Sequence, residues 1–178
     1  MQSLAIIATS IAAAILYGIV HDQITARICV EYFTIGHPRL IQSESPTILG
    51  LFWGIVATWW VGLALGIGLA ISARIGGRPK LRLTDILHPI QCLMLAMFAL
   101  AILAGLIGFI TATSGVFFLV EPFSSRVPED RHTAFLTVGW AHSASYLSGF
   151  IGGIILWIKT WRKRGVLTQA DHSAISPT

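Results

Sequence analysis

The chain has 178 residues, of which 54% are hydrophobic and only 11% are charged, and its mean hydropathy is +0.75. This apolar share is well above that of soluble domains and excludes an ordinary soluble globular protein. The net charge of +4 is concentrated beside apolar segments, which indicates contact with anionic lipid and not with nucleic acid.

Four long uncharged segments follow one another along the chain. A membrane-spanning helix needs about 20 apolar residues, and a backbone in lipid must satisfy its own hydrogen bonds. We therefore predict an all-α membrane protein, a bundle of four transmembrane helices in one domain covering residues 1–166. The predicted helices span residues 3–20, 47–74, 89–115 and 133–160, and residues 167–178 are predicted to form a polar cytoplasmic tail.

The connection after the first predicted helix is rich in ionisable side chains, among them His21, Asp22, Arg27 and Glu31. Between residues 24 and 32 the apolar side chains occupy the even positions. This period of two predicts a short extended segment or β-hairpin arm, with a distorted interfacial helix as the alternative. We expect the 21–34 segment to fold over the outer ends of the first and fourth helices.

The second predicted helix carries small residues at every fourth position, including Gly54, Gly62 and Gly66. This spacing places small side chains on one face, where another helix can approach closely. Packing inside the bundle is the preferred interpretation. Formation of a homo-oligomer, or binding of a membrane protein partner through an exposed glycine face, is the alternative.

Basic residues are distributed unequally between the two sides of the predicted bundle. Eight of the 12 Lys and Arg residues lie between Arg74 and His88 or after Ile158: Arg74, Arg78, Lys80, Arg82, Lys159, Arg162, Lys163 and Arg164. The positive-inside rule then predicts cytoplasmic N- and C-termini and places the 21–46 and 121–132 connections outside.

The fourth predicted helix contains a histidine, His142, about ten residues into its uncharged run. An ionisable side chain inside a membrane segment indicates a functional site. Ser145 and Tyr146 follow three and four residues later and therefore share its face.

A metal or polar-ligand site follows if the first outer connection reaches this helix. The candidate ligands are His21, Asp22, Glu31 and His142, whose nitrogen and oxygen atoms suit a divalent metal such as Zn, Fe or Mn. The supporting candidates are Gln23, Arg27, Ser145 and Tyr146. We expect His21 or Glu31 to approach His142 or Tyr146.

A purely structural interpretation competes with this site. Asp22 and Glu31 would pair with Arg27 or cap turns, and His142 would bond to a serine or a backbone carbonyl, as polar groups in helix bundles commonly do. The ligand spacing matches no standard metal motif such as HExxH. Haem held by His142 and His21 is less supported than a single metal ion because the two residues are predicted at different depths.

Two stretches, "YGIVHDQIT…EYFTIGHP" (17–38) and "WAHSASYLSGFIGG" (140–153), resemble a family of uncharacterised bacterial four-helix integral membrane proteins with an HDQ…EYFT outer-loop motif. The similarity spans about half of the chain. The resemblance implies a four-helix fold and a bacterial inner-membrane location. It implies no reaction.

Three classes of function remain from the sequence. The preferred one is a non-catalytic accessory or assembly subunit of a larger membrane complex. The alternative is an outward-facing metal- or ligand-binding protein that uses the four candidate ligands, with redox or hydrolytic chemistry. A small transporter ranks third, because the first three predicted helices contain no buried charge and no inverted repeat is visible. Whether the protein is an enzyme is left open at this stage.

Overall fold

The computed structural model describes the backbone of residues 1–175 and the side chains of residues 1–169. Four helical segments are long and apolar enough to cross a membrane, namely Gln2–Ile28, Pro46–Arg74, Thr84–Thr113 and Glu129–Gln169. The predicted all-α four-helix bundle is confirmed.

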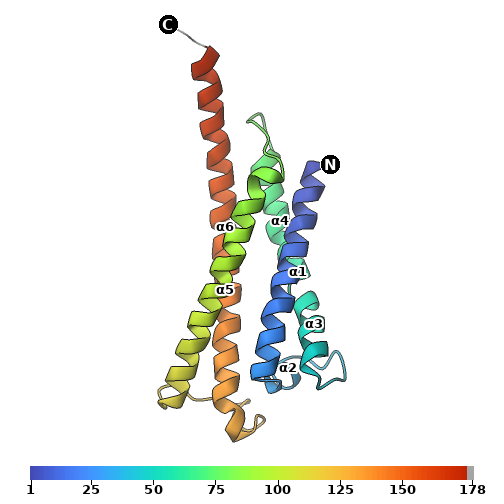
Figure 1. Ribbon diagram of the computed structural model, residues 1–178, viewed down its shortest axis with the longest axis vertical. Coiled ribbons are helices and arrows are strands. Elements are labelled where there is room, and N and C mark those ends of the chain that lie inside the picture. Colours follow the sequence, from blue (N-terminus) through green and yellow to red (C-terminus); the bar gives the residue numbers. More distant parts are fainter. Residues whose placement is uncertain (176–178) are drawn as a thin grey trace.

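The helices form two packed groups, which Figure 1 shows side by side. Helix α1 packs against α3 and α4, α5 packs against α6, and the two groups meet mainly where α4 contacts α6. The N-terminus, the 75–83 connection and the last described turns of α6 lie at one end, and the other two connections lie at the opposite end. The elements are α1 (Gln2–Ile28), α2 (Glu31–Thr34), α3 (Pro46–Val56), α4 (Trp59–Arg74), α5 (Thr84–Thr113), the 3-10 turn η1 (Glu129–Arg131) and α6 (His132–Ile175).

Helix α1 continues eight residues beyond its predicted end, and the predicted extended segment or β-hairpin arm is wrong. The segment after residue 20 is helical as far as Ile28, and a four-residue helix, α2, follows. Every second one of the even positions is four residues from the next, and residues four apart lie on the same face of a helix. Accordingly, Ile24 and Ile28 are exposed, whereas Asp22 and Ala26 are buried.

The second membrane segment is interrupted between Val56 and Trp59, where α3 ends and α4 begins. The Thr58 hydroxyl donates to the Gly54 carbonyl four residues earlier. Such a bond competes with the helical ladder and bends helices. The predicted single helix over 47–74 is therefore two helices.

The third and fourth segments also differ from their predicted ends. Helix α5 begins at Thr84, five residues before the predicted start, and Asp85 in its first turn accepts the Arg82 backbone N–H at 2.7 Å. The helix ends at Thr113, shortly before Gly115, whose φ of +72° is left-handed and favours glycine. Helix α6 continues to Ile175, so the predicted tail begins as helix, and residues 176–178 lie outside the described part of the chain.

Most glycines of α3 and α4 lie against α1. A Cβ atom on Gly54 would lie 2.6 Å from Ile19 Cα, and one on Gly62 would lie 2.8 Å from Ile11 Cα. Both neighbouring atoms belong to the backbone and cannot move aside as a side-chain end can. Gly66 lies on the same face, where its Cβ would meet Ser10. Close approach of α1 thus depends on small residues at these positions.

Arg164 joins α6 to the end of α4 and to the 75–83 connection through hydrogen bonds. Its side chain is completely buried, with 0% exposure. Its guanidinium donates four hydrogen bonds of 2.7–3.0 Å to the backbone carbonyls of Ser72, Ile75, Arg78 and Pro79. Because these carbonyls follow or end α4, one side chain satisfies acceptors that the helix itself leaves without partners.

Candidate functional site

Three side chains with metal-ligand atoms meet between α1 and α6. His21 and Asp22 come from α1 and His142 from α6, and one ligand atom from each lies within 4.8 Å of the others. All three residues are 5–6% exposed. The structure therefore brings together three of the four candidate ligands inside the bundle.

His142 is the centre of the contacts within this cluster. Its Nε2 lies 3.7 Å from Asp22 Oδ1 and 3.1 Å from the Thr25 hydroxyl oxygen. Thr25 also lies 3.1 Å from the backbone carbonyl of His21, to which its hydroxyl can donate. The rings of His21 and His142 meet edge to face with centroids 4.5 Å apart.

His21 is only partly satisfied. Its Nδ1 lies 3.5 Å from the Ser145 hydroxyl, which in turn lies 2.7 Å from the Tyr17 hydroxyl. Its Nε2 is buried and has no hydrogen-bond partner among the described residues. Buried polar atoms nearly always have a hydrogen-bond partner, so this unpaired nitrogen indicates that a ligand atom or ion binds here.

Asp22 has no permanently charged partner in the described part of the chain. Among the described residues, the one side chain that forms an ion-pair contact with it within 4.0 Å is that of His142. Arg27, predicted as its counter-charge, instead donates to Gln23 and to the Thr47 hydroxyl. An ionised carboxylate buried without a cation is costly by several kcal/mol, so Asp22 requires a proton, a protonated histidine or a metal ion.

Helix α2 covers the cluster from the end of the bundle opposite the termini. The rings of Tyr32 and Phe33 lie 4.7 and 5.7 Å from the His142 ring. His37 stacks on Phe33 at 5.4 Å, and its Nδ1 lies 3.0 Å from the Tyr32 carbonyl oxygen. Only the part of the predicted 21–34 segment that follows Ile28 therefore covers the site, with aromatic side chains facing it, because residues 21–28 continue α1.

Tyr32 and His37, whose rings lie in this cover, remain neutral near pH 7. Burial raises the pKa of Tyr32 to about 12. Burial also lowers the pKa of His37, although its bond with the Tyr32 carbonyl partly opposes the shift. Neither residue therefore supplies a positive charge to Asp22.

Glu31 does not belong to the cluster, which corrects its prediction as a ligand. Its Oε2 accepts a hydrogen bond from Arg131 Nε at 3.1 Å, and the Cys29 thiol donates to the same oxygen at 3.4 Å. Arg131 also donates to the Ile28 carbonyl at 2.9 Å. Glu31 thus links the α1–α2 junction to the start of α6.

We expect the Glu31 contact to make stability depend on acidic pH. Burial alone would raise the pKa of Glu31, but hydrogen bonds from its own backbone N–H and from Arg131 outweigh this effect and lower it. The contact therefore stabilises the fold above the carboxyl's unfolded pKa of about 4.3, and its contribution is lost as the pH falls through the lower folded value.

The measurement is the thermal midpoint of wild type and of Glu31→Gln across this acidic range, with Glu44→Gln as the surface control. The thermal midpoint of wild type should exceed that of Glu31→Gln near neutral pH, and this difference should disappear in acid. An advantage that is constant with pH would contradict the assignment.

The other predicted residues have separate positions. Gln23 donates to the Thr47 carbonyl at 2.9 Å and so joins α1 to α3. Ser145 contacts His21, and Tyr146 lines the adjoining cavity. The sequence interpretation missed Tyr17 and Thr25, which lie four residues before and after His21. That spacing places all three on one face once α1 is known to extend past residue 20.

The donor set determines the chemistry that is available. Two imidazoles and one carboxylate form the set of non-haem iron centres and also suit zinc and manganese. Ligands bonded to one ion at about 2.0–2.2 Å lie roughly 3–3.6 Å apart, close to the 3.7 Å between His142 and Asp22. Comparisons with protein families, with curated proteins and with solved structures found no match.

Proposed function

We propose that this protein binds one divalent transition metal ion, iron, manganese or zinc, inside the membrane through His21, Asp22 and His142. The observation that carries the proposal is their convergence in the buried interior, where the described residues give Asp22 no fixed cation and His21 Nε2 no hydrogen-bond partner. A metal ion would supply the cation for Asp22 and the partner for His21 Nε2. Three protein ligands leave coordination positions open, as in catalytic and not in structural metal sites.

Metal binding requires that the hydroxyl hydrogen of Thr25 point away from His142. The Thr25 hydroxyl would donate to the His21 carbonyl and leave His142 Nε2 free of a proton, so that this nitrogen can bind the ion. The positive metal then offsets the buried carboxylate of Asp22. Haem held between both histidines does not fit, because ring centroids 4.5 Å apart leave no room for a porphyrin.

This proposal now ranks above the accessory-subunit hypothesis and the transporter. The accessory hypothesis drew its support from glycine faces free to bind a partner, yet Gly54 and Gly62 lie against α1. Transport ranked low partly because the first three helices were thought to contain no buried charge, which is wrong for Asp22 of α1. A single polar cluster beside an apolar cavity, however, supports a binding site more than a polar path.

Metal content tests the proposed function. Protein purified without a histidine tag and dialysed against chelator, then loaded with Zn²⁺ or Mn²⁺, should retain about one ion per chain. Asp22→Asn and His142→Ala should each lower the affinity by about tenfold or more, since each removes one of three ligands.

His88→Ala and His132→Ala are the matched controls, because both histidines lie outside the cluster, and they should bind metal as wild type does. Equal metal content in wild type, Asp22→Asn and His142→Ala would contradict the proposal. Thermal unfolding of each variant separates loss of metal from loss of fold.

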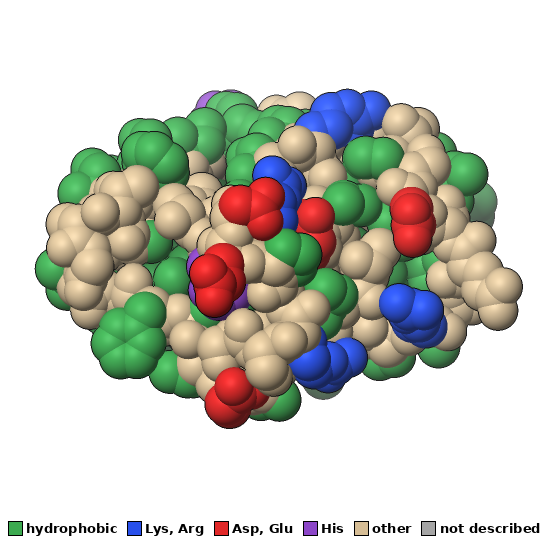
Figure 2. All heavy atoms as spheres, turned by 90° about the horizontal axis from the view of Figure 1, so that it is seen from below, with side chains coloured by type: hydrophobic (Ala, Val, Ile, Leu, Met, Phe, Trp, Pro, Cys, Tyr) green, Lys and Arg blue, Asp and Glu red, His purple; other side chains and the backbone are tan. Residues whose placement is uncertain are grey.

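We further propose that the chain is a multi-pass protein of a bacterial inner membrane with cytoplasmic termini. The resemblance of the 17–38 and 140–153 stretches supports the setting, and the charge distribution supports the orientation. The end opposite the termini carries acidic and basic side chains interspersed (Figure 2). The terminal end carries the eight basic residues given above.

Cysteine labelling of whole cells tests this orientation. In a Cys92→Ser background, Arg126→Cys should react with a membrane-impermeant reagent and Lys80→Cys should not, because the two exposed positions lie at opposite ends. Cys29 is buried and serves as a silent native thiol. Preferential labelling at residue 80 would reverse the orientation.

A further inference from the structure

A cavity begins at the candidate metal site and extends along the bundle. It is lined by α1, α4, α5 and α6 and contains about 930 Å³ of space, part of it open to the outside. Along α1 it reaches from Asp22 to Ser10, a length of roughly 18 Å at 1.5 Å per residue. The length of the cavity, and not its volume, therefore indicates an elongated ligand.

The wall of this cavity is apolar away from the site. Ala13, Leu65, Leu93 and Met94 are among the residues that form it. Its few polar side chains are satisfied within the protein: the Ser10 hydroxyl donates to the Ile6 carbonyl, the Thr58 hydroxyl to the Gly54 carbonyl, and Trp157 Nε1 to the Leu65 carbonyl. The long part of the cavity therefore offers a ligand no free side-chain hydrogen-bond donor, which favours a hydrocarbon chain.

Polar atoms are gathered at the other end of the cavity. The metal-ligand cluster lies there together with the hydroxyls of Tyr17, Ser145 and Tyr146. A ligand that fits must therefore have one polar end and one long apolar end.

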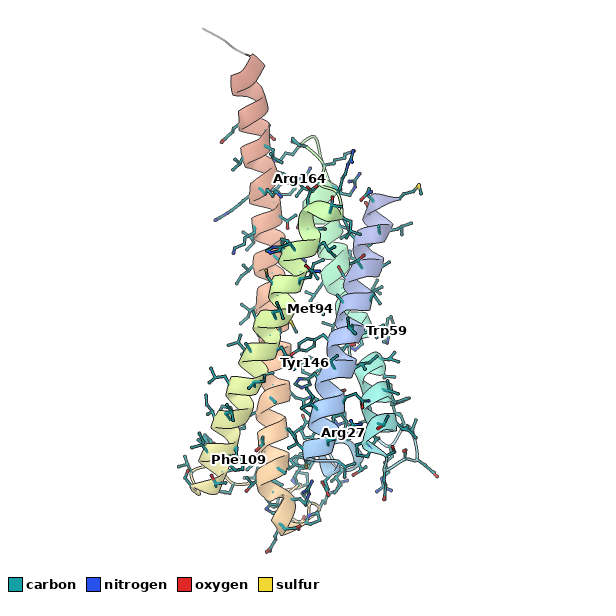
Figure 3. The ribbon with its side chains drawn as sticks, viewed as in Figure 1. Arg27, Trp59, Met94, Phe109, Tyr146 and Arg164 are labelled. Atoms are coloured by element: carbon teal, nitrogen blue, oxygen red, sulfur yellow. The ribbon has the colours of Figure 1, made fainter. Side chains whose placement is uncertain are left out.

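The cavity opens at the depth of the lipid. Tyr146 lines it and is nevertheless 46% exposed, although it lies 14 residues into α6, about 21 Å from the start of that helix. In Figure 3 Tyr146 and Met94 both lie beside the space between α5 and α1. A ligand passing between these helices comes from the membrane interior and not from water.

We propose that the cavity holds a long-chain fatty acid whose carboxylate binds the metal while its alkyl chain follows the apolar wall; this inference rests on the proposed function. A divalent ion with one carboxylate and two neutral imidazoles has a net charge of +1. Inside an apolar interior an unbalanced charge is costly, so an anionic head group is preferred over a neutral one. The open coordination positions provide the place for that carboxylate.

The test uses Co²⁺ as a spectroscopic metal in protein reconstituted in phosphatidylcholine nanodiscs. The visible Co²⁺ bands should change on addition of palmitate and should stay unchanged with hexadecanol or with acetate at the same concentration. Met94→Trp, which narrows the cavity without touching a ligand, should keep the bands of the ligand-free protein. It should weaken the palmitate response by about tenfold or more, because extra volume in a packed space is disfavoured.

Leu95→Trp is the matched control, since Leu95 is the next residue on the same helix, is 71% exposed and does not line the cavity. It should respond to palmitate as wild type does. Bound cobalt whose bands ignore palmitate would overturn the fatty-acid inference and leave the metal site standing. An equal response to hexadecanol would overturn the carboxylate head group, and failure to bind cobalt would overturn the metal site and this inference together.

Discussion

Replacing Arg164 with alanine should lower the free energy of unfolding by about 3–5 kcal/mol, the largest loss that we expect from a single substitution outside the candidate site. The guanidinium is completely buried and donates to four backbone carbonyls at the end of α4 and in the following connection. Its removal leaves four partly buried carbonyl acceptors without these donors, and each such loss is costly.

Thermal or denaturant unfolding in detergent measures this effect. Arg162→Ala is the matched control, because Arg162 is exposed on the same helix, and its effect should stay below about 0.5 kcal/mol. Arg164→Lys should be intermediate, since an ammonium keeps the charge but lacks the planar fork that reaches several carbonyls at once. Equal stability of Arg164→Ala and Arg162→Ala would show that the carbonyls find other donors.

Replacing Gly62 with leucine should lower the free energy of unfolding by about 3 kcal/mol, at the upper end of the range for overpacking. The first added carbon would already lie 2.8 Å from Ile11 Cα and from the Ser10 carbonyl oxygen. Because both belong to the backbone of α1, the helix itself must move. Such a shift would also displace the α1 residues of the candidate metal site.

Gly105→Ala is the control for the general effect of replacing a helical glycine. Its added Cβ would lie 3.5 Å from Ala141 Cβ, an ordinary contact, so stability should be unchanged or slightly higher. Unfolding in detergent compares the two variants. If Gly62→Leu were as stable as Gly105→Ala, α1 would not pack on the glycine face of α4 as described.

The four-helix fold was predictable because the lengths of uncharged segments are set by the thickness of the membrane. The ends of the helices were not, because a charged residue does not mark a helix end when it has a partner. Asp22 lies inside α1 beside His142 of α6, and Arg27 lies inside α1 bonded to Thr47 at the start of α3. Neither partner is visible in the local sequence.

The candidate site was predictable in part for a similar reason. His142 drew attention as an ionisable residue within an apolar segment, and the structure places His21 and Asp22 beside it. Glu31 was assigned wrongly because its partner, Arg131, lies 100 residues later in the chain. Tyr17 and Thr25 were missed because they share a helical face with His21 only if α1 continues beyond residue 20.

The central claim is that His21, Asp22 and His142 bind one metal ion, and metal-edge X-ray absorption of the loaded protein tests it most directly. We expect a first shell of nitrogen and oxygen at about 2.0–2.2 Å, with the outer-shell signal of two imidazoles. His142→Ala, if it retains metal, should lose half of that imidazole signal. A metal shell made only of oxygen, with no imidazole contribution in the wild-type protein, would contradict the claim.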